Sequence, residues 1–255
     1  MLLILPPSES KYPGGEEGTA LDLGRLSFPE LQAPRETVLD ALAELARDVD
    51  AMALALKVGP GLRGEIERNR EVRSSATTPA IDRFTGVLFD ALDAPTLDQQ
   101  QREFASATIA IHSALFGLVG AGDPIPAYRL SHDSKLPGIS LKRVWAKVIG
   151  EALSQREGII LDLRSEAYAA LGPIPRGPDA RFVRVVADDA DGRRRALNHF
   201  NKKGKGEFVR AFLEDQPNIR TLDELCEWSA AAGFPLEPGR EGELELVVRN
   251  SLAAA

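Results

Sequence analysis

The sequence of 255 residues has few of the side chains that form disulfides or bind metals, with one cysteine, Cys226, and three histidines. A single cysteine excludes an internal disulfide and a cysteine-rich zinc site, and it fits a reducing compartment. The histidines, His112, His132 and His199, do not lie at ligand spacing from one another or from the cysteine. We therefore expect neither a bound metal nor a cofactor.

Long apolar runs are absent too. The opening MLLILPP reaches Pro6 and Pro7 after five apolar residues, with no basic residue before them. A secretory signal needs a longer apolar region behind a basic start, and a membrane span needs about 20 apolar residues. We expect a cytoplasmic protein without a membrane anchor.

Two motifs that would identify a reaction are missing: there is no GxxxxGK[ST] phosphate loop and no HExxH zinc pair. A serine, histidine and aspartate triad cannot be assigned from scattered residues. No enzymatic reaction is therefore indicated by motif.

Strand and helix patterns alternate along the chain and predict one mixed α/β unit over residues 1–255, with no repeat. Strands are expected at Leu2–Leu5, Thr108–His112, Gly158–Leu163, Arg181–Val186, Ala196–Phe200 and Glu243–Arg249. Helices are expected at Arg35–Leu56, 62–72, Leu141–Leu153 and 206–215, and after capping boxes at Thr96–Gln99 and Thr221–Glu224. The loop Pro6–Pro34, which carries Ser8 and Lys11, is long enough to be a binding loop.

Residues 38–73 resemble a helix-hairpin-helix element, because two helical patterns flank the stretch KVGPG that starts at Lys57. In such a motif the hairpin and the start of the second helix present backbone N–H groups to a phosphate. Candidate phosphate-binding residues are Lys57, Gly59, Gly61 and Arg63, with further charge from Arg68, Arg70 and Arg73. The alternative is an ordinary helical hairpin closed by glycine and proline.

The stretch Arg193–Arg210 holds seven basic residues and one acid, Glu207, in a chain of net charge −7. Clustered cations repel one another unless an anion is present, and cations near a helix N-terminus are disfavoured by about 0.3–1 kcal/mol each. The candidate phosphate-binding residues are Lys202, Lys203, Lys205 and Arg210, and the interrupting glycines favour a functional role. The alternative is a solvated charged face.

A second group of polar residues lies near a predicted strand end. Ser165 and Tyr168 follow the apolar run GIILDL, at the carboxyl end where open α/β sheets bind ligands, although Ser165 also suits a helix N-cap. Tyr128 and Arg129 lie in a glycine- and proline-rich stretch. With Ser8 and Lys203, these residues would suit an enzyme acting on a small phosphorylated or nucleobase-like ligand.

Six segments resemble the bacterial YaaA peroxide-stress protein family: LLILPPSESK, FTGVLFDAL, HSALFGLVGAGDPIPAYRL, the helix with Trp145, LDLRSEAY and FNKKGKGEFVRAF. They occur in the family's order and spacing over nearly the whole chain. The resemblance implies one mixed α/β domain with a central mixed sheet, surrounding helices, a basic cleft and a helix-hairpin-helix element. It also implies a cytoplasmic peroxide-stress protein that binds duplex or branched DNA and limits iron-dependent oxidative damage by keeping free iron low.

Individual residues can be compared with the positions of the family's motifs. Tyr128-Arg129, Trp145, Ser165, Tyr168 and Lys202-Lys203 align with family positions, whereas Lys205 stands where the family often has arginine, and Lys11 is displaced by one position from the family's lysine. A lysine keeps the charge but loses the bidentate geometry of arginine. Two functions stay open, a DNA-binding stress protein that does not read base sequence and an enzyme acting on a small anionic ligand.

Overall fold

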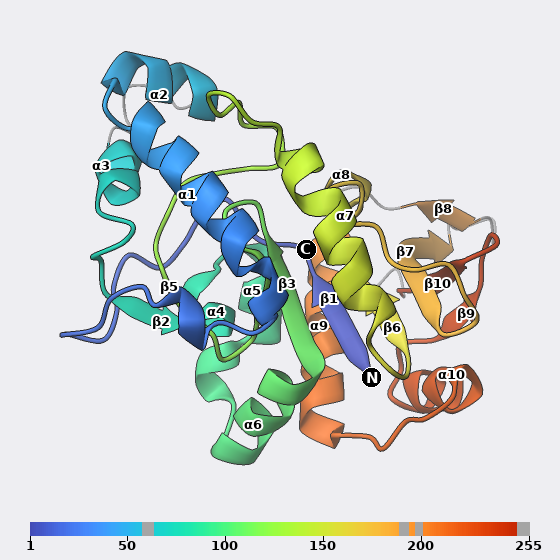
Figure 1. The fold of residues 1–255 in the computed structure, drawn as a ribbon. Helices are drawn as coiled ribbons and strands as arrows, with labels where there is room; N and C mark the ends of the chain where they lie inside the picture. Colours follow the sequence, from blue (N-terminus) through green and yellow to red (C-terminus); the bar gives the residue numbers. More distant parts are fainter. Residues whose placement is uncertain (58–63, 189–193, 197–200, 249–255) are drawn as a thin grey trace.

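The structure of the chain is a computed structural model that describes residues 1–57, 64–188, 194–196 and 201–248. Its centre is a mixed sheet with the strand order β4-β3-β1-β6-β7-β10-β9 (Figure 1). Five of these strands are parallel: β1 (Leu2–Leu5), β3 (Ile109–Ser113), β6 (Ile160–Asp162), β7 (Ala180–Asp188) and β10 (Glu243–Val247). Antiparallel strands at the sheet are β4 (Gly117–Gly120), β9 (Leu236–Pro238) and β8 (Arg194–Ala196), which pairs with β7. The fold confirms the expected mixed α/β class.

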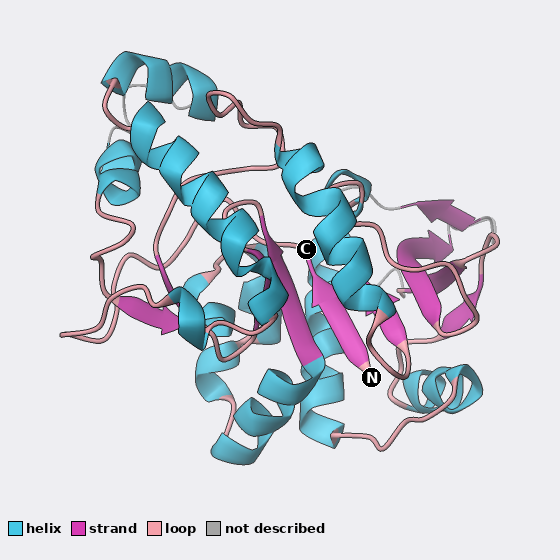
Figure 2. Cartoon of the chain, viewed as in Figure 1, coloured by secondary structure: helices cyan, strands magenta, loops and turns pink. Residues whose placement is uncertain are grey.

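Helices enclose the central strands on two sides, with α1 and α7 in front and α9 behind in the view of Figures 1 and 2. All residues of β1, β3 and β6 are buried, as expected of parallel strands covered on both faces. The longer helices are α1 (Gln32–Leu45), α2 (Val49–Leu56), α6 (Gln99–Thr108), α7 (Leu141–Ser154), α9 (Asn201–Asp215) and α10 (Leu222–Ala231). The shorter ones are α3 (Gly64–Arg70), α4 (Ala80–Arg83), α5 (Val87–Leu92) and α8 (Glu166–Ala169), and β2 (Thr77–Pro79) pairs with β5 (Pro124–Pro126) outside the main sheet.

The strand order contains a topological switch point, where the connections from two neighbouring parallel strands lead to opposite sides of the sheet. From β1 the chain continues to β3 on one side, and from β6 it continues to β7 on the other, although β1 and β6 are neighbours. Open α/β sheets bind ligands outside the carboxyl ends of strands at such a switch point. The residues that follow β1 and β6 are therefore the first place to look for a site.

The predicted single helix over Arg35–Leu56 is wrong, because the chain forms two helices there. α1 ends at Leu45, and Asp48 adopts an extended conformation (φ −110°, ψ 108°) as the N-cap of α2. Its carboxylate accepts hydrogen bonds from the backbone N–H groups of Asp50 (3.0 Å) and Ala51 (2.9 Å). An aspartate that satisfies the first donors of a helix starts a new one even inside a continuous apolar pattern.

The helix-hairpin-helix prediction is met only at its two flanking helices. α2 and α3 pack against each other and lie on either side of residues 58–63. Residues 58–63, including Gly59, Gly61 and Arg63, lie outside the described residues, so the hairpin stays a prediction.

Local capping signals were more accurate than strand and helix ends. Thr221 and Glu224 form the expected capping box of α10, and Ser165 caps α8. At α6, however, the capping box is formed by Asp98 and Gln101 rather than Thr96 and Gln99. The aspartate side chain competes well for this position, since it accepts hydrogen bonds from the free N–H groups.

Helix α9 begins five residues earlier than the predicted helix 206–215, so the three lysines lie within its first turns and not in a loop before it. The predicted strand at 196–200 is confirmed at Ala196, the last residue of β8, and stays a prediction at 197–200, which lie outside the described residues. The predicted turn at Asp191-Gly192 lies outside them as well.

The two glycines of α9 have a packing role. A Cβ atom at Gly206 would overlap the carbonyl oxygen of Leu88 in α5, and one at Gly204 would lie 2.7 Å from Val248 Cγ1. Glycine at these positions lets α9 approach α5 and the sheet closely. The glycines that favoured a functional reading of the basic stretch are therefore explained by packing.

Candidate functional site at the carboxyl ends of β1 and β6

An open cavity of about 560 Å³ lies at the switch point. The loop that follows β1 forms one wall, and the residues after β6 form another. α5 and α9 complete the lining, which consists of Pro6–Ser10, Thr85–Phe89, Ser131, His132, Ser165, Tyr168, Asn201, Lys202 and Lys205. Its size suits a small organic ligand. We call it the switch-point cavity.

The three lysines of α9 lie on different faces of the helix. Lys202 and Lys205 are three residues apart and both line the cavity, as expected for positions on one helix face. Lys203 points elsewhere and forms an ion pair of 3.7 Å with Glu207. Lys202 is exposed, whereas the side chain of Lys205 is buried.

Lys205 is the most unusual cation of the site. It is 4 % exposed, and its Nζ donates a long hydrogen bond of 3.4 Å to the backbone carbonyl of Arg164. It forms no ion pair with a described carboxylate. Burial lowers the pKa of Lys205 to about 8; Asp162 opposes this effect and Arg184 adds to it. The amine is therefore mainly protonated at pH 7, with a larger neutral fraction than an ordinary lysine has.

A buried charge network lies beneath the cavity, at the end of β6. Arg164 donates from Nε and Nη2 to the two carboxylate oxygens of Asp162, at 2.8 and 2.6 Å. Its Nη1 lies 2.7 Å from Nδ1 of His112. Because a guanidinium can only donate, Nδ1 accepts and the ring proton of the neutral histidine lies on Nε2. Burial, reinforced by Arg164, holds the pKa of His112 well below its usual value.

Tyr168 connects this network to the cavity wall. Its ring meets the rings of His112 and His132 edge-on, with centroid distances of 5.7 and 5.2 Å. Its pKa is raised, chiefly by burial, while a hydrogen bond from the His132 backbone opposes the rise. The phenol therefore keeps its proton and can donate it to a ligand.

Ser165 lines the cavity and also performs the capping role that the sequence offered as its alternative. Its Oγ accepts a hydrogen bond of 3.4 Å from the Tyr168 backbone N–H. Asn201, at the start of α9, brings a further polar group. Its buried Oδ1 has no hydrogen-bond partner among the described residues.

The loop after β1 is held in place by Lys11. The buried ammonium group donates to the carbonyl oxygens of Ser8 (2.9 Å) and Glu9 (3.2 Å). It also lies over the ring of Tyr128, 4.2 Å from the centroid, where a cation is attracted by the aromatic face. Burial lowers the pKa of Lys11 to about 7; the nearby Arg129 contributes to the same shift. Lys11 thus shapes the loop that carries Ser8 to the cavity.

The six candidates for an enzyme site do not all converge, and Lys203 has already been placed outside the cavity. Ser8, Ser165 and Tyr168 line the switch-point cavity. Tyr128 lies behind the wall, 1 % exposed, with its hydroxyl 2.7 Å from Ser113 Oγ. Arg129 lines a smaller neighbouring pocket. Tyr128 therefore has a structural role, because its hydroxyl and ring are both engaged inside the protein.

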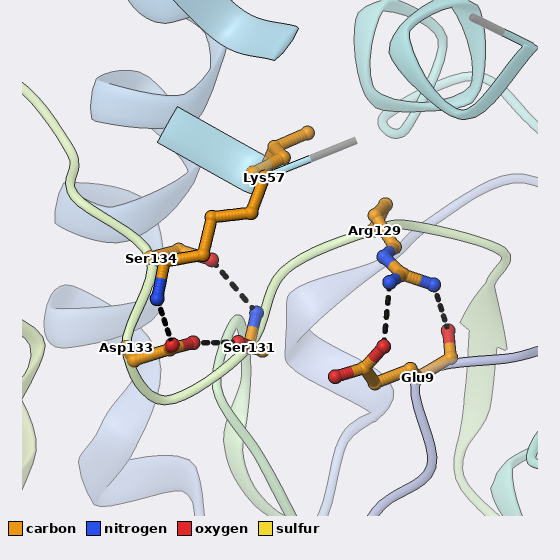
Figure 3. A pocket seen from close by; sticks show the side chains of 7 residues that line it. Glu9, Lys57, Arg129, Ser131, Asp133 and Ser134 are labelled. Atoms are coloured by element: carbon orange, nitrogen blue, oxygen red, sulfur yellow. Dashed lines mark hydrogen bonds and ion pairs between the residues drawn. The ribbon is translucent and has the colours of Figure 1, made fainter. Parts of the chain in front are cut away.

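The smaller pocket, of about 100 Å³, is shown in Figure 3. Arg129 points toward Glu9 and forms an ion pair of 2.6 Å with its carboxylate. Lys57, at the end of α2, reaches Asp133, which also accepts a hydrogen bond from Ser131. Lys57 thereby lowers the pKa of Asp133 to about 2. The cations of this pocket are matched by acids, so it has little excess positive charge.

The other predicted phosphate-binding cations are similarly engaged. Arg210 bonds to Glu214 and to the carbonyl oxygen of Asp93. In the element around α3, Arg68 pairs with Glu65, and Arg70 pairs with Glu67. Arg73 pairs with Glu36 and Asp40. Of the predicted lysines and arginines at described positions, Lys202 and Lys205 are those that face the cavity.

Some residues of the site were missed by the sequence reasoning. Asn201, His132 and the Asp162–Arg164–His112 network were not assigned a role there. Asp162 is the last residue of β6 and Arg164 lies two residues beyond it, and charged residues at the end of a buried strand are a usable signal. No group of three His, Cys, Asp or Glu side chains suited to a metal occurs in the part of the chain that the structure describes. Likewise, no described helix is both long and apolar enough to cross a membrane.

Comparison with known proteins gives one consistent result. The family model described as peroxide stress protein YaaA matches residues 1–239. A UPF0246 protein of Corynebacterium glutamicum (strain R) is 43 % identical over 255 residues, which cover 97 % of this chain and 100 % of the relative. The UPF0246 protein SCO2297 of Streptomyces coelicolor is 38 % identical over 98 % of this chain and 99 % of its own. The chain therefore belongs to the YaaA peroxide stress protein family, and this membership supports a role in peroxide stress.

Proposed function

We propose that this peroxide stress protein binds a small phosphorylated or nucleobase-like ligand in the switch-point cavity. The observation that carries the proposal is the position of Lys205, a buried amine without a described carboxylate partner, in the wall of a cavity at the switch point. Burying an unpaired cation is unfavourable, so an anionic ligand would supply the missing partner. Lys202, on the same helix face, would contact the phosphate from the solvent side.

The rest of the lining suits the organic part of such a ligand. Phe89 and Tyr168 offer aromatic surface, and the orphaned Oδ1 of Asn201 offers an acceptor for a base or sugar hydroxyl. Ligand sites commonly combine apolar walls with a few polar groups in this way.

A thermal-stability screen with nucleotides and sugar phosphates tests this function. A bound ligand at about 100 times its dissociation constant should stabilise the protein by about 2.7 kcal/mol. Lys202→Ala and Lys205→Met should each reduce that ligand-induced stabilisation, whereas Lys203→Ala, which alters a neighbouring lysine outside the cavity, should not. The absence of any stabilising compound, or an undiminished response in both cavity variants, would overturn the proposal.

The second candidate function is binding of duplex or branched DNA without base reading. It is favoured by Lys202 and Lys203 in the first turn of α9, where the described residues include no acid. Cations there are unfavourable next to the helix N-terminus unless an anion approaches, and phosphates would be such anions. We further propose that DNA binding takes place in the cytoplasm and helps limit iron-dependent oxidative damage.

Fluorescence anisotropy with a labelled duplex and a four-way junction, at several salt concentrations, tests DNA binding. The double reversal Lys202→Glu/Lys203→Glu should weaken binding for every base sequence and flatten the slope of log affinity against log salt by about 2, since each lost phosphate contact removes about 0.9. The control variant Lys142→Glu/Lys147→Glu changes the net charge by the same amount as the double reversal on α9, but at two exposed positions of α7. If both double variants lose the same affinity for DNA, the loss is explained by net charge alone, and a binding site on α9 is contradicted.

A further inference from the structure

We infer that Lys205 is a nucleophile that forms an imine with the aldehyde of a phosphate-bearing sugar in the switch-point cavity. The inference rests on the proposed binding of a phosphorylated ligand and adds a covalent step to it. It is carried by the placement of the Lys205 and Lys202 amines on one face of α9, one buried and one exposed.

The surroundings of Lys205 favour a reactive amine over a permanent cation. A lysine that serves structure is normally paired with a carboxylate when buried, but among the described residues the one hydrogen bond of Lys205 Nζ is a long one of 3.4 Å to a backbone carbonyl. Phe182 lies below it, with Nζ 5.9 Å from the ring centroid. Desolvation of this kind activates lysine, because the neutral amine is the nucleophile. The lowered pKa of Lys205, about 8, agrees with this environment.

The exposed amine of Lys202 and the buried amine of Lys205, which both line the cavity, indicate the class of ligand. Residues three apart on a helix are separated by about 4.5 Å along its axis, and Lys202 is the outer of the two. A ligand with a phosphate and an aldehyde a few bonds apart would place its anion on the Lys202 ammonium and its carbonyl carbon near Lys205. Small sugar phosphates in their open-chain form have this arrangement.

The chemical step balances without a further reactant. The lone pair of the Lys205 amine attacks the carbonyl carbon, a C–N bond forms, and the C=O π electrons move to oxygen. A proton passes from nitrogen to that oxygen to give a carbinolamine. The C–O bond then breaks, water leaves, and the C=N bond of the imine forms. The phenol of Tyr168, which lines the same cavity and keeps its proton, is placed to protonate the departing hydroxyl, and the N–H proton of the resulting iminium then returns to the phenolate to leave the neutral imine.

The same chemistry is available from two sources. One is a free sugar phosphate. The other is an abasic site in DNA, where the sugar that has lost its base exposes an aldehyde between two phosphates. The open cavity and the exposed Lys202 at its wall accept either source in principle, so the experiment compares them directly.

The test traps the imine by reduction. The full chain is incubated with 2-deoxyribose 5-phosphate, or with an oligonucleotide containing one abasic site, in the presence of sodium cyanoborohydride, and the modified lysine is found by peptide mass spectrometry. Lys205 should be modified about tenfold more than any of the other lysines, as expected for an activated amine. Lys205→Met should lose this adduct, and the matched variant Lys203→Met should retain it.

The outcomes separate the two levels of the proposal. Modification spread over exposed lysines with Lys205 spared would overturn the imine inference. The alditol phosphate made by reducing the sugar cannot form an imine. If the alditol phosphate stabilises the wild type but the aldehyde forms no Lys205 adduct, ligand binding is supported and imine formation is overturned. If the alditol phosphate does not stabilise the wild type and no adduct forms, both ligand binding and imine formation are overturned. An adduct with only one of the two aldehydes supports the inference and identifies its source.

Discussion

Replacing Lys205 with methionine should stabilise the folded protein by about 3 kcal/mol at pH 7. The amine is 4 % exposed, and burial lowers its pKa from 10.5 to about 8. Each pH unit between these values corresponds to about 1.4 kcal/mol, so holding the charged form in the fold is unfavourable by about 3 kcal/mol. Methionine has a similar length and no charge to desolvate. A gain from removing a native side chain would indicate that Lys205 is retained for function.

The gain should depend on pH in a defined direction. Because the folded-state pKa lies below the unfolded-state value, the unfolded chain binds more protons between pH 8 and 10.5. The penalty is fully present below pH 8 and disappears as the pH rises toward 10.5, so the advantage of Lys205→Met should fall to about 1.4 kcal/mol at pH 9.5. Urea denaturation at pH 7 and pH 9.5 measures this advantage, with Lys203→Met as the control at a half-buried lysine outside the cavity. A destabilised methionine variant at pH 7 would show that the amine contributes to folding.

Replacing Arg164 with methionine should destabilise the fold by about 3–5 kcal/mol, the largest loss we expect. The guanidinium is fully buried and donates to both oxygens of Asp162 and to His112 Nδ1. Without it, the 1 % exposed Asp162 carboxylate is left without its ion partner. Losing one partner of a buried pair costs more than losing both, because an uncompensated charge stays in a medium of low polarity.

The double variant Asp162→Asn/Arg164→Met is the matched control for this loss. Removing both charges should recover a large part of the stability lost in Arg164→Met. Denaturant midpoints and slopes measured for the wild type, the two single variants and the double variant give the coupling energy directly. A loss below about 1 kcal/mol in Arg164→Met would mean that water reaches this network, in contradiction to its burial.

These two variants address different layers of the same site. Arg164 lies two residues after β6 and bonds to Asp162 in that strand, whereas Lys205 projects from α9 toward the carbonyl oxygen of Arg164 at the same strand end. Arg164 should therefore stabilise the fold. Lys205 should destabilise the fold and serve the chemistry of the ligand. Sites that place an unfavourable group on a rigid scaffold commonly show this division.

Features of the fold that depend on residues close together in the chain could be predicted from the sequence. Apolar runs predicted β1 and β6, and an alternating pattern predicted β3. Serine, threonine and glutamate at the right spacing predicted the caps of α8 and α10. The edge of the sheet that carries the cavity was also predictable, because a polar residue such as Ser165 directly after a buried strand lies at its carboxyl end. Family membership followed from six short segments and is confirmed by the match over residues 1–239.

Burial of charged residues was not readable from the sequence. Arg35 and Arg83 are fully buried and donate to backbone carbonyl oxygens of distant segments, such as Phe116 for Arg35 and Ile125 for Arg83. In the sequence they resemble surface arginines. Only the folded chain brings those carbonyl groups together, because their partners are 81 and 42 residues away.

The basic stretch illustrates the division most clearly. The sequence by itself determined that cations are concentrated near residue 202 and that strands and helices alternate, since composition and periodicity are local properties. Only the tertiary structure decided that Gly206 packs against α5, that Lys203 faces away, and that Lys202 and Lys205 face a cavity. The physical reason is that the rotational phase of α9 is fixed by its packing on β7 and on α5, and α5 is distant in sequence.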